Sequence, residues 1–166
     1  MPKTRKLALM AMFTAASLIV FIIEAQIPAP IPVPGVKLGL ANVVTLIAMV
    51  MLGRREAGLI LLVRIAMGSM FTGGVSAFIF SIAGGALAYA VMCLTLKLFP
   101  EKLLWVVSVL GAIAHNLGQL IAAIIITKTS SLILYAPVLL ASAVVTGAFT
   151  GLAAMYLTQR LDKRVG

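Results

Sequence analysis

Long apolar runs separated by short polar turns make up most of the chain. At 1.5 Å rise per residue, a helix of about twenty apolar residues crosses a hydrocarbon core of about 30 Å. The pattern predicts an all-α integral membrane protein with six transmembrane helices, in a single domain over residues 1–166. The runs cover about residues 7–24, 38–52, 57–71, 75–98, 103–126 and 132–161.

The most unusual break between the runs is rich in proline. Four prolines fall between Pro28 and Pro34, and a helix cannot continue through them because proline has no backbone N–H and biases its predecessor toward extended geometry. Ordered non-helical backbone at membrane depth survives where protein buries it or a cavity lies beside it. This stretch is therefore expected to close over something.

Composition supports the membrane assignment. Of the 166 residues 63% are hydrophobic and 10% charged, and the mean hydropathy is +1.19, whereas a soluble domain carries roughly a quarter charged residues. The net charge of +9 lies at the ends of the apolar runs. Since no basic face with interleaved aromatic residues is present, a nucleic-acid partner is excluded.

Lysine and arginine are distributed unequally between the two sets of turns, which predicts the orientation. With both termini cytoplasmic, ten basic residues face the inside, two face the outside, and Arg64 lies within the membrane. The proline-rich stretch is then external. The ten inner residues are Lys3, Arg5, Lys6, Arg54, Arg55, Lys97, Lys102, Arg160, Lys163 and Arg164, and the two outer ones are Lys37 and Lys128.

The sequence offers little for catalysis. It contains no GxxxxGK[ST] loop for ATP. Its four acidic residues include no pair spaced for acid–base work or for holding Mg²⁺. Cys93 is the sole cysteine, so neither a disulfide nor a cysteine-based metal site is possible within one chain. We expect no enzyme activity, no metal and no cofactor.

Several polar side chains interrupt the apolar runs and are candidate ligand contacts. Arg64 lies about 10 Å deep, where an arginine costs on the order of 3 kcal/mol and normally faces a partner, a cavity or a ligand; snorkelling is the alternative. His115, Asn116 and Gln119 fall within about one turn, with 115 and 119 on one face. They either contact a ligand or form hydrogen bonds between helices.

Three more residues are weaker candidates for the outer mouth of such a pocket. Lys37 contacts the ligand or is a solvated loop charge. Asn42 contacts the ligand, caps the second helix or pairs with its neighbours. Tyr135 lines the outer mouth or belongs to an ordinary loop, since the turn beside it contains serines and such turns are common in loops. Glu24, at the outer end of the first helix, is interpreted as an interfacial residue.

Small residues mark two possible packing surfaces. Ala11 and Ala15, four residues apart in the first run, allow another helix to approach closely in lipid, although alanine is common in any membrane helix. Gly147 and Gly151 form a GxxxG pair of the same kind in the last run. Internal packing is the favoured interpretation for that pair.

These features together resemble the substrate-binding S component of energy-coupling factor (ECF) transporters. The likeness rests on the AxxxA in the first run and on a segment that combines Leu38-Gly39, Leu46, Leu52-Gly53 and Gly58. The stretch PGVKLGLANVVTLIAM is similar to the Gx transporter family, whose members are often labelled heptaprenyl diphosphate synthase component I. The resemblance covers essentially the whole chain.

The resemblance implies roles for several parts of the chain. Ala11 and Ala15 would face the transmembrane coupling subunit, residues 28–42 would act as the gate over the substrate, and the last three helices would supply much of the pocket. Many S components carry an Asp-Ile-Pro step where this chain has Ala41-Asn42-Val43, so the substrate stays open. The chain also lacks the DDxxD motif that prenyl transfer needs.

The sequence therefore predicts an S component in a prokaryotic cytoplasmic membrane. It would bind a small vitamin- or precursor-like solute, anionic, aromatic or prenyl-like, and would need a coupling subunit and two ATPases on other chains. The alternative is a membrane accessory subunit of a polyprenyl (heptaprenyl) diphosphate synthase. A structural membrane protein without a ligand is the third reading.

Overall fold

The fold was analysed in a computed structural model that describes residues 2–27, 37–72 and 74–165, with side chains for all of these except 72 and 161–165. Every regular element in these residues is a helix. The α-helices are α1 (Lys3–Gln26), α2 (Asn42–Met51), α3 (Arg54–Thr72), α4 (Gly74–Leu98), α5 (Leu104–Thr127) and α6 (Ala136–Val165). The short 3-10 helices are η1 (Glu101–Leu103) and η2 (Ser130–Tyr135).

Five of the six predicted helices begin and end within a few residues of their predicted positions, but α2 is shorter than predicted. The sequence pattern starts this helix at residue 38, whereas α2 begins at Asn42. Gly39 has a φ of +77°, which is left-handed backbone that glycine adopts without the Cβ penalty of other residues. Residues 37–41 therefore enter the bundle as a non-helical segment, which we call the entry segment.

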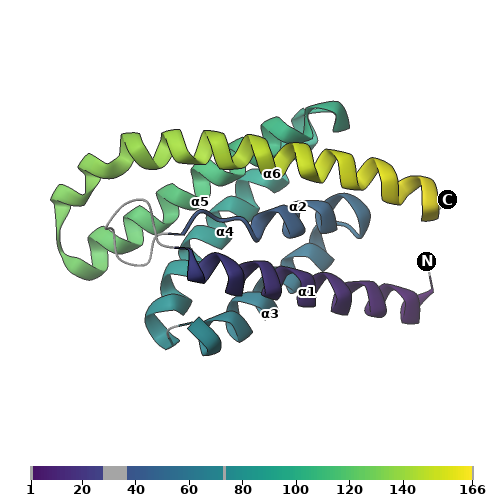
Figure 1. Cartoon of the computed structure of the whole chain (residues 1–166), viewed down its shortest axis with the longest axis horizontal. Helices are drawn as coiled ribbons and strands as arrows, with labels where there is room; N and C mark the ends of the chain where they lie inside the picture. The colour runs from purple at the N-terminus through teal and green to yellow at the C-terminus, as the bar shows by residue number, and fades with distance from the viewer. Residues whose placement is uncertain (1, 28–36, 73, 166) are drawn as a thin grey trace.

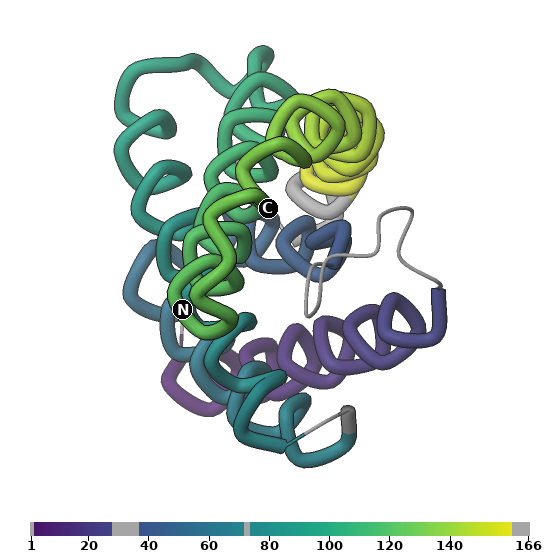
Figure 2. The backbone as a smooth tube through the Cα atoms, turned by 90° about the vertical axis from the view of Figure 1, so that its left-hand side faces the viewer, coloured from purple at the N-terminus to yellow at the C-terminus, as the bar shows by residue number. Residues whose placement is uncertain are grey.

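The helices form one elongated bundle with α2 at its centre. In both views α2 lies between α1 and α6 (Figures 1 and 2). The main apolar core gathers around it, with buried residues of α2, α3, α4, α5 and α6. A smaller core joins α4 and α5 to α6 near η2. Because α2 is covered on several sides, it behaves as a central core helix.

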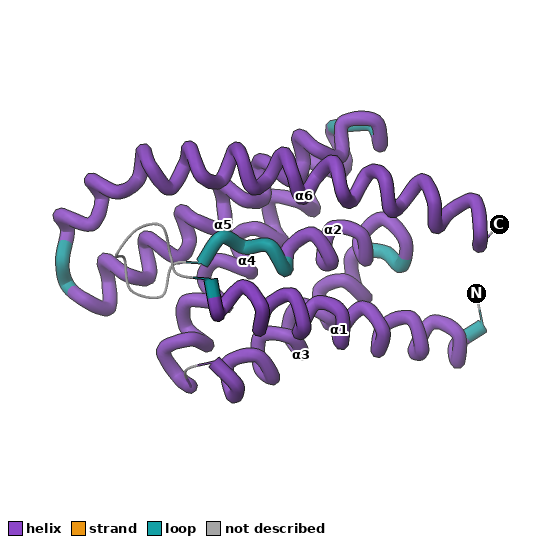
Figure 3. Tube along the Cα trace, in the orientation of Figure 1, coloured by secondary structure: helices purple, strands orange, loops and turns teal. Residues whose placement is uncertain are grey.

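The two chain termini lie at the same end of the bundle (Figure 1). The turns between α2 and α3 and between α4 and α5 lie toward this end, and the turn between α5 and α6 lies at the opposite end (Figure 3). We call the first end the terminal end. The basic residues of the predicted inner face fall on its turns and termini, so the fold is compatible with the orientation predicted from charge.

Within the described residues, four helices are long and apolar enough to cross a membrane: α1, α4, and the segments containing α5 and α6. α2 has 10 residues and is about 15 Å long, about half of a hydrocarbon core. α3 has 19 residues, three of them charged in its first turn. The chain thus has the character of a multi-pass membrane protein, while six crossings with cytoplasmic termini stay a prediction.

The GxxxG pair of α6 packs inside the molecule, as favoured from sequence. A Cβ placed on Gly151 would lie 2.5 Å from the Trp105 Cα, and one on Gly147 would lie 2.6 Å from the Val109 Cα. Both contacts are with the backbone of α5, which cannot move aside as a flexible side chain does. Small residues at this spacing let the two helices approach closely.

We expect Gly151→Leu to separate α5 from α6 and to destabilise the protein by about 1–3 kcal/mol or more, the usual cost of overpacking. The measurement is thermal unfolding of the purified full chain in detergent. Phe149→Leu on the exposed face of α6 is the matched control and should unfold like the wild type. Wild-type stability of Gly151→Leu would contradict the close packing.

Candidate functional site

Glu24 attaches the entry segment to α1. Its side chain is 4% exposed. The Gly39 N–H donates to Oε1 at 2.5 Å and the Ala41 N–H donates to Oε2 at 3.4 Å. The interpretation of Glu24 as an interfacial residue was wrong, because both carboxylate oxygens face buried backbone. One acidic side chain thus determines where the chain re-enters the bundle before α2.

Gln119 attaches the same segment to α5. Its Oε1 accepts a hydrogen bond from the Lys37 N–H at 2.9 Å, and its side chain is 1% exposed. The Lys37 ammonium lies 3.9 Å from the centroid of the Phe21 ring, which is cation–π distance. Lys37 is therefore folded back over α1 and is not a freely solvated loop charge.

Arg64 reaches this region from α3. It is 3% exposed, so it does not snorkel to the surface. Its Nη2 donates to the Asn42 Oδ1 at 3.5 Å, and its guanidinium carbon lies 5.5 Å from the Phe21 ring centroid. Asn42 is the first residue of α2, and the N-cap position belongs to Ala41. The side-chain oxygen of Asn42 receives the arginine.

His115 and Gln119 complete the site from α5, on the one face that their four-residue spacing predicts. His115 is 4% exposed, and its ring packs against two glycines. A Cβ on Gly39 would lie 2.8 Å from its Cδ2, and one on Gly84 would lie 2.9 Å from its Cε1. These glycines let the entry segment and α4 approach the imidazole closely.

These groups enclose a cavity, which we call the polar cavity. Its volume of about 10 Å³ is room for about one water molecule. It is bounded by α1, the entry segment, α3, α4 and α5. The lining residues are Phe21, Glu24, Lys37, Gly39, Arg64, Ser81, His115 and Gln119.

The sequence-predicted candidates divide into two groups in the structure. The polar cavity is lined by four of them: Lys37, Arg64, His115 and Gln119. Asn42 lies next to this group, since it accepts a hydrogen bond from Arg64. Asn116 donates from Nδ2 to the Leu139 carbonyl of α6 at 2.9 Å, and Tyr135 packs against the smaller apolar core. The last two lie outside this cavity.

Four lining residues were not candidates from sequence. Phe21 and Ser81 look like ordinary membrane-helix residues, and no sequence signal separates them from their neighbours. Gly39 belongs to the Leu38-Gly39 step of the family resemblance, but that step does not indicate a cavity. Glu24 had a signal, since it is one of only four acidic residues in the chain and directly follows an apolar run. The predicted gate covers residues 28–42, of which 28–36 lie outside the described residues.

Comparison with protein families identifies the chain. A sequence model described as heptaprenyl diphosphate synthase component I, the Gx transporter family, matches residues 13–157. The chain belongs to this family. The family match contains every residue that lines the polar cavity. Searches of curated proteins and of solved structures returned no match.

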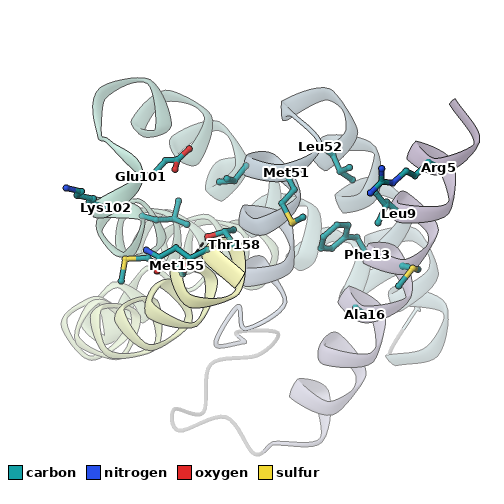
Figure 4. A pocket seen from close by; sticks show the side chains of 14 residues that line it. Arg5, Leu9, Phe13, Ala16, Met51, Leu52, Glu101, Lys102, Met155 and Thr158 are labelled. Atoms are coloured by element: carbon teal, nitrogen blue, oxygen red, sulfur yellow. Dashed lines mark hydrogen bonds between the residues drawn. The ribbon is translucent and has the colours of Figure 1, made fainter. Parts of the chain in front are cut away.

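A second and larger cavity opens at the terminal end of the bundle. It has a volume of about 640 Å³, and Figure 4 shows its lining side chains converging from α1, α2 and α6 and from the start of α5. Its walls are mainly apolar, with Arg5, Glu101 and Lys102 among the lining residues. We call it the terminal groove. Its α1 wall begins before residue 13, where the family match starts.

Ala11 and Ala15 lie beside this groove on α1. Both are exposed, while Ala16 and Met12 line the groove itself. An exposed pair of alanines next to an apolar groove is available to a partner helix.

Proposed function

We propose that this member of the family is the substrate-binding S component of an ECF-type importer. It would bind a small vitamin- or precursor-like solute from outside, and uptake would need a separate coupling subunit and ATPases. The observation that carries the proposal is the polar cavity, where charged and amide groups from four parts of the chain meet inside an otherwise apolar bundle.

Burial of these groups is hard to explain by stability alone. Ionisable side chains within the membrane are costly and usually mark a ligand or transport path. Replacing buried ionic groups by well-packed apolar ones is often neutral or stabilising. A buried arginine and histidine and a half-buried lysine in one cluster therefore support a binding role, while Glu24 holds the entry segment.

Solute binding requires the cavity to widen. A space of about 10 Å³ is far smaller than the 300–1,000 Å³ typical of ligand pockets. The entry segment is the wall best suited to move. It is non-helical, and the N–H groups of Lys37, Gly39 and Ala41 attach it to the side chains of α1 and α5 by three hydrogen bonds. Such closure over a bound molecule also excludes water.

The coupling subunit is proposed to bind α1 at Ala11 and Ala15. We expect Ala11→Leu combined with Ala15→Leu to abolish co-purification of the coupling subunit and ATPases from native membranes, because leucine prevents close helix approach. The matched control is Ala86→Leu with Ala90→Leu, two exposed alanines at the same spacing on α4. Undiminished recovery with the α1 variant would remove Ala11 and Ala15 from the interface.

The second candidate is a membrane accessory subunit of a polyprenyl diphosphate synthase. The family description favours it, and the terminal groove offers an apolar surface with basic residues at its lining. The same purification separates the two functions. Recovery of a coupling subunit with ATPases supports uptake, and recovery of a soluble prenyl synthase supports the accessory role.

A further inference from the structure

We propose that the polar cavity receives a compact oxyanion of the solute, a carboxylate, between Lys37 and Arg64. This inference rests on the proposed binding function and names the chemical class of the solute. It follows from the charges of the cavity, from its unused hydrogen-bonding groups and from the position of Phe21.

The charges lining the cavity leave a positive excess. Lys37 and Arg64 contribute two positive charges, and Glu24 contributes at most one negative charge. Within the described residues, neither cation forms an ion pair within 4 Å, since the one pair found there joins Lys6 to Glu56. The net charge of the cluster is therefore positive whether Glu24 is ionised or protonated. A cationic solute is repelled, and an anionic one is attracted.

The residues around the cavity also leave more hydrogen-bond donors than acceptors without a partner. The oxygen acceptors of three side chains are in use: both Glu24 oxygens receive backbone N–H groups, Gln119 Oε1 receives the Lys37 N–H, and Asn42 Oδ1 receives Arg64. His115 Nδ1, which can accept or donate, is buried without a partner in the described part of the chain. Donors remain unused, because Lys37 Nζ, Arg64 Nε and Asn42 Nδ2 are buried without a hydrogen-bond partner in the described part of the chain. Unsatisfied buried donors need an acceptor, and a solute oxyanion can supply it in place of water.

Phe21 is a shared contact of the two cations. The Lys37 ammonium and the Arg64 guanidinium lie 3.9 and 5.5 Å from the centroid of its ring. An aromatic face attracts cations without using their N–H groups in strong bonds. Both cations are thereby held at the cavity with N–H groups available. Charge-assisted hydrogen bonds to a carboxylate are roughly twice as strong as neutral ones, so this arrangement favours an oxyanion over a neutral carbonyl.

The test uses acetate and acetamide, two small probes of similar shape that differ in charge. Thermal unfolding of the purified full chain is followed as each probe is titrated, with sodium held constant by sodium chloride, whose anion carries no carboxylate. We expect acetate to raise the unfolding temperature and acetamide to leave it unchanged. Equal responses to acetate and acetamide would overturn the proposal.

Substitutions of the two cations test whether acetate binds in the polar cavity. Lys37→Gln and Arg64→Gln should each weaken the acetate response by about 30-fold or more in affinity, the usual result of removing one partner of a buried charged hydrogen bond. Lys37 is only half-buried, so its variant keeps the test valid if Arg64→Gln fails to fold. Lys102→Gln, on an exposed residue at the terminal end, should respond like the wild type. A wild-type response in Lys37→Gln would overturn the assignment to this cavity.

The acetate titration is independent of the uptake proposal, because it uses the purified chain without a coupling subunit. A response to acetate without any recovery of ATPases would support the anion site and count against the importer. Recovery of the ATPases with equal responses to acetate and acetamide would support the importer and overturn the anion site.

Discussion

Replacing Glu24 with leucine is expected to lower the free energy of unfolding by roughly 2–6 kcal/mol. The Gly39 and Ala41 N–H groups both lose their acceptor, and an orphaned buried donor costs about 1–3 kcal/mol. Lys37 and Arg64 also lose the carboxylate that lies nearest in the cluster. Denaturation of the full chain in detergent, monitored by circular dichroism or tryptophan fluorescence, measures the loss.

The isosteric variant Glu24→Gln removes the carboxylate charge but keeps one hydrogen-bond acceptor. Glutamine keeps one carbonyl oxygen and can still accept one of the two N–H groups, so its loss of stability should be intermediate. Glu101→Gln removes an exposed carboxylate from η1 and should stay within about 0.5 kcal/mol of the wild type, as ordinary surface changes do. If Glu24→Leu unfolds like the wild type, the carboxylate does not hold the entry segment.

Arg64→Met is expected to separate stability from binding. Methionine fills a similar volume without a charge. Arg64 has no ion-pair partner within 4 Å among the described residues, and burying an unpaired charge is costly, so removing the charge relieves that cost. The ligand-free variant should therefore unfold at or above the wild-type temperature. Binding of an anionic probe should fall by about 30-fold or more, because Arg64 supplies the deepest positive charge of the cavity.

Both readouts are needed for Arg64→Met. A strongly destabilised variant would show that Arg64 mainly holds Asn42 and the start of α2, through its 3.5 Å hydrogen bond. Unchanged acetate binding in a stable variant would show that the guanidinium does not contact the anion. Gain or retention of stability together with loss of binding is the pattern of a residue kept for function.

The helices were predictable because hydrophobic run length in a membrane protein is a strong signal. The exception was α2. Residues 38–41 are apolar or glycine, so their sequence continues the helical run, but Glu24 takes two of their backbone N–H groups. The competing partner comes from another helix, and periodicity within a segment contains no information about it.

The candidate site was predictable where helical spacing decides direction. His115 and Gln119 are four residues apart and line the same cavity. Asn116 lies on a neighbouring face, and its amide bonds α6 instead, the interhelical alternative recognised from sequence. Gly147 and Gly151 likewise form the internal contact favoured for them. Phe21 and Ser81 were missed because their role depends on which helices become neighbours.

Native mass spectrometry of the full chain purified from its own membranes tests directly whether the polar cavity binds a solute. We expect the 17.4 kDa chain together with one small molecule that carries a carboxylate, and we expect Arg64→Met to be isolated without it. A wild-type chain that, like Arg64→Met, carries no small molecule would contradict the assignment of the polar cavity as a solute-binding site.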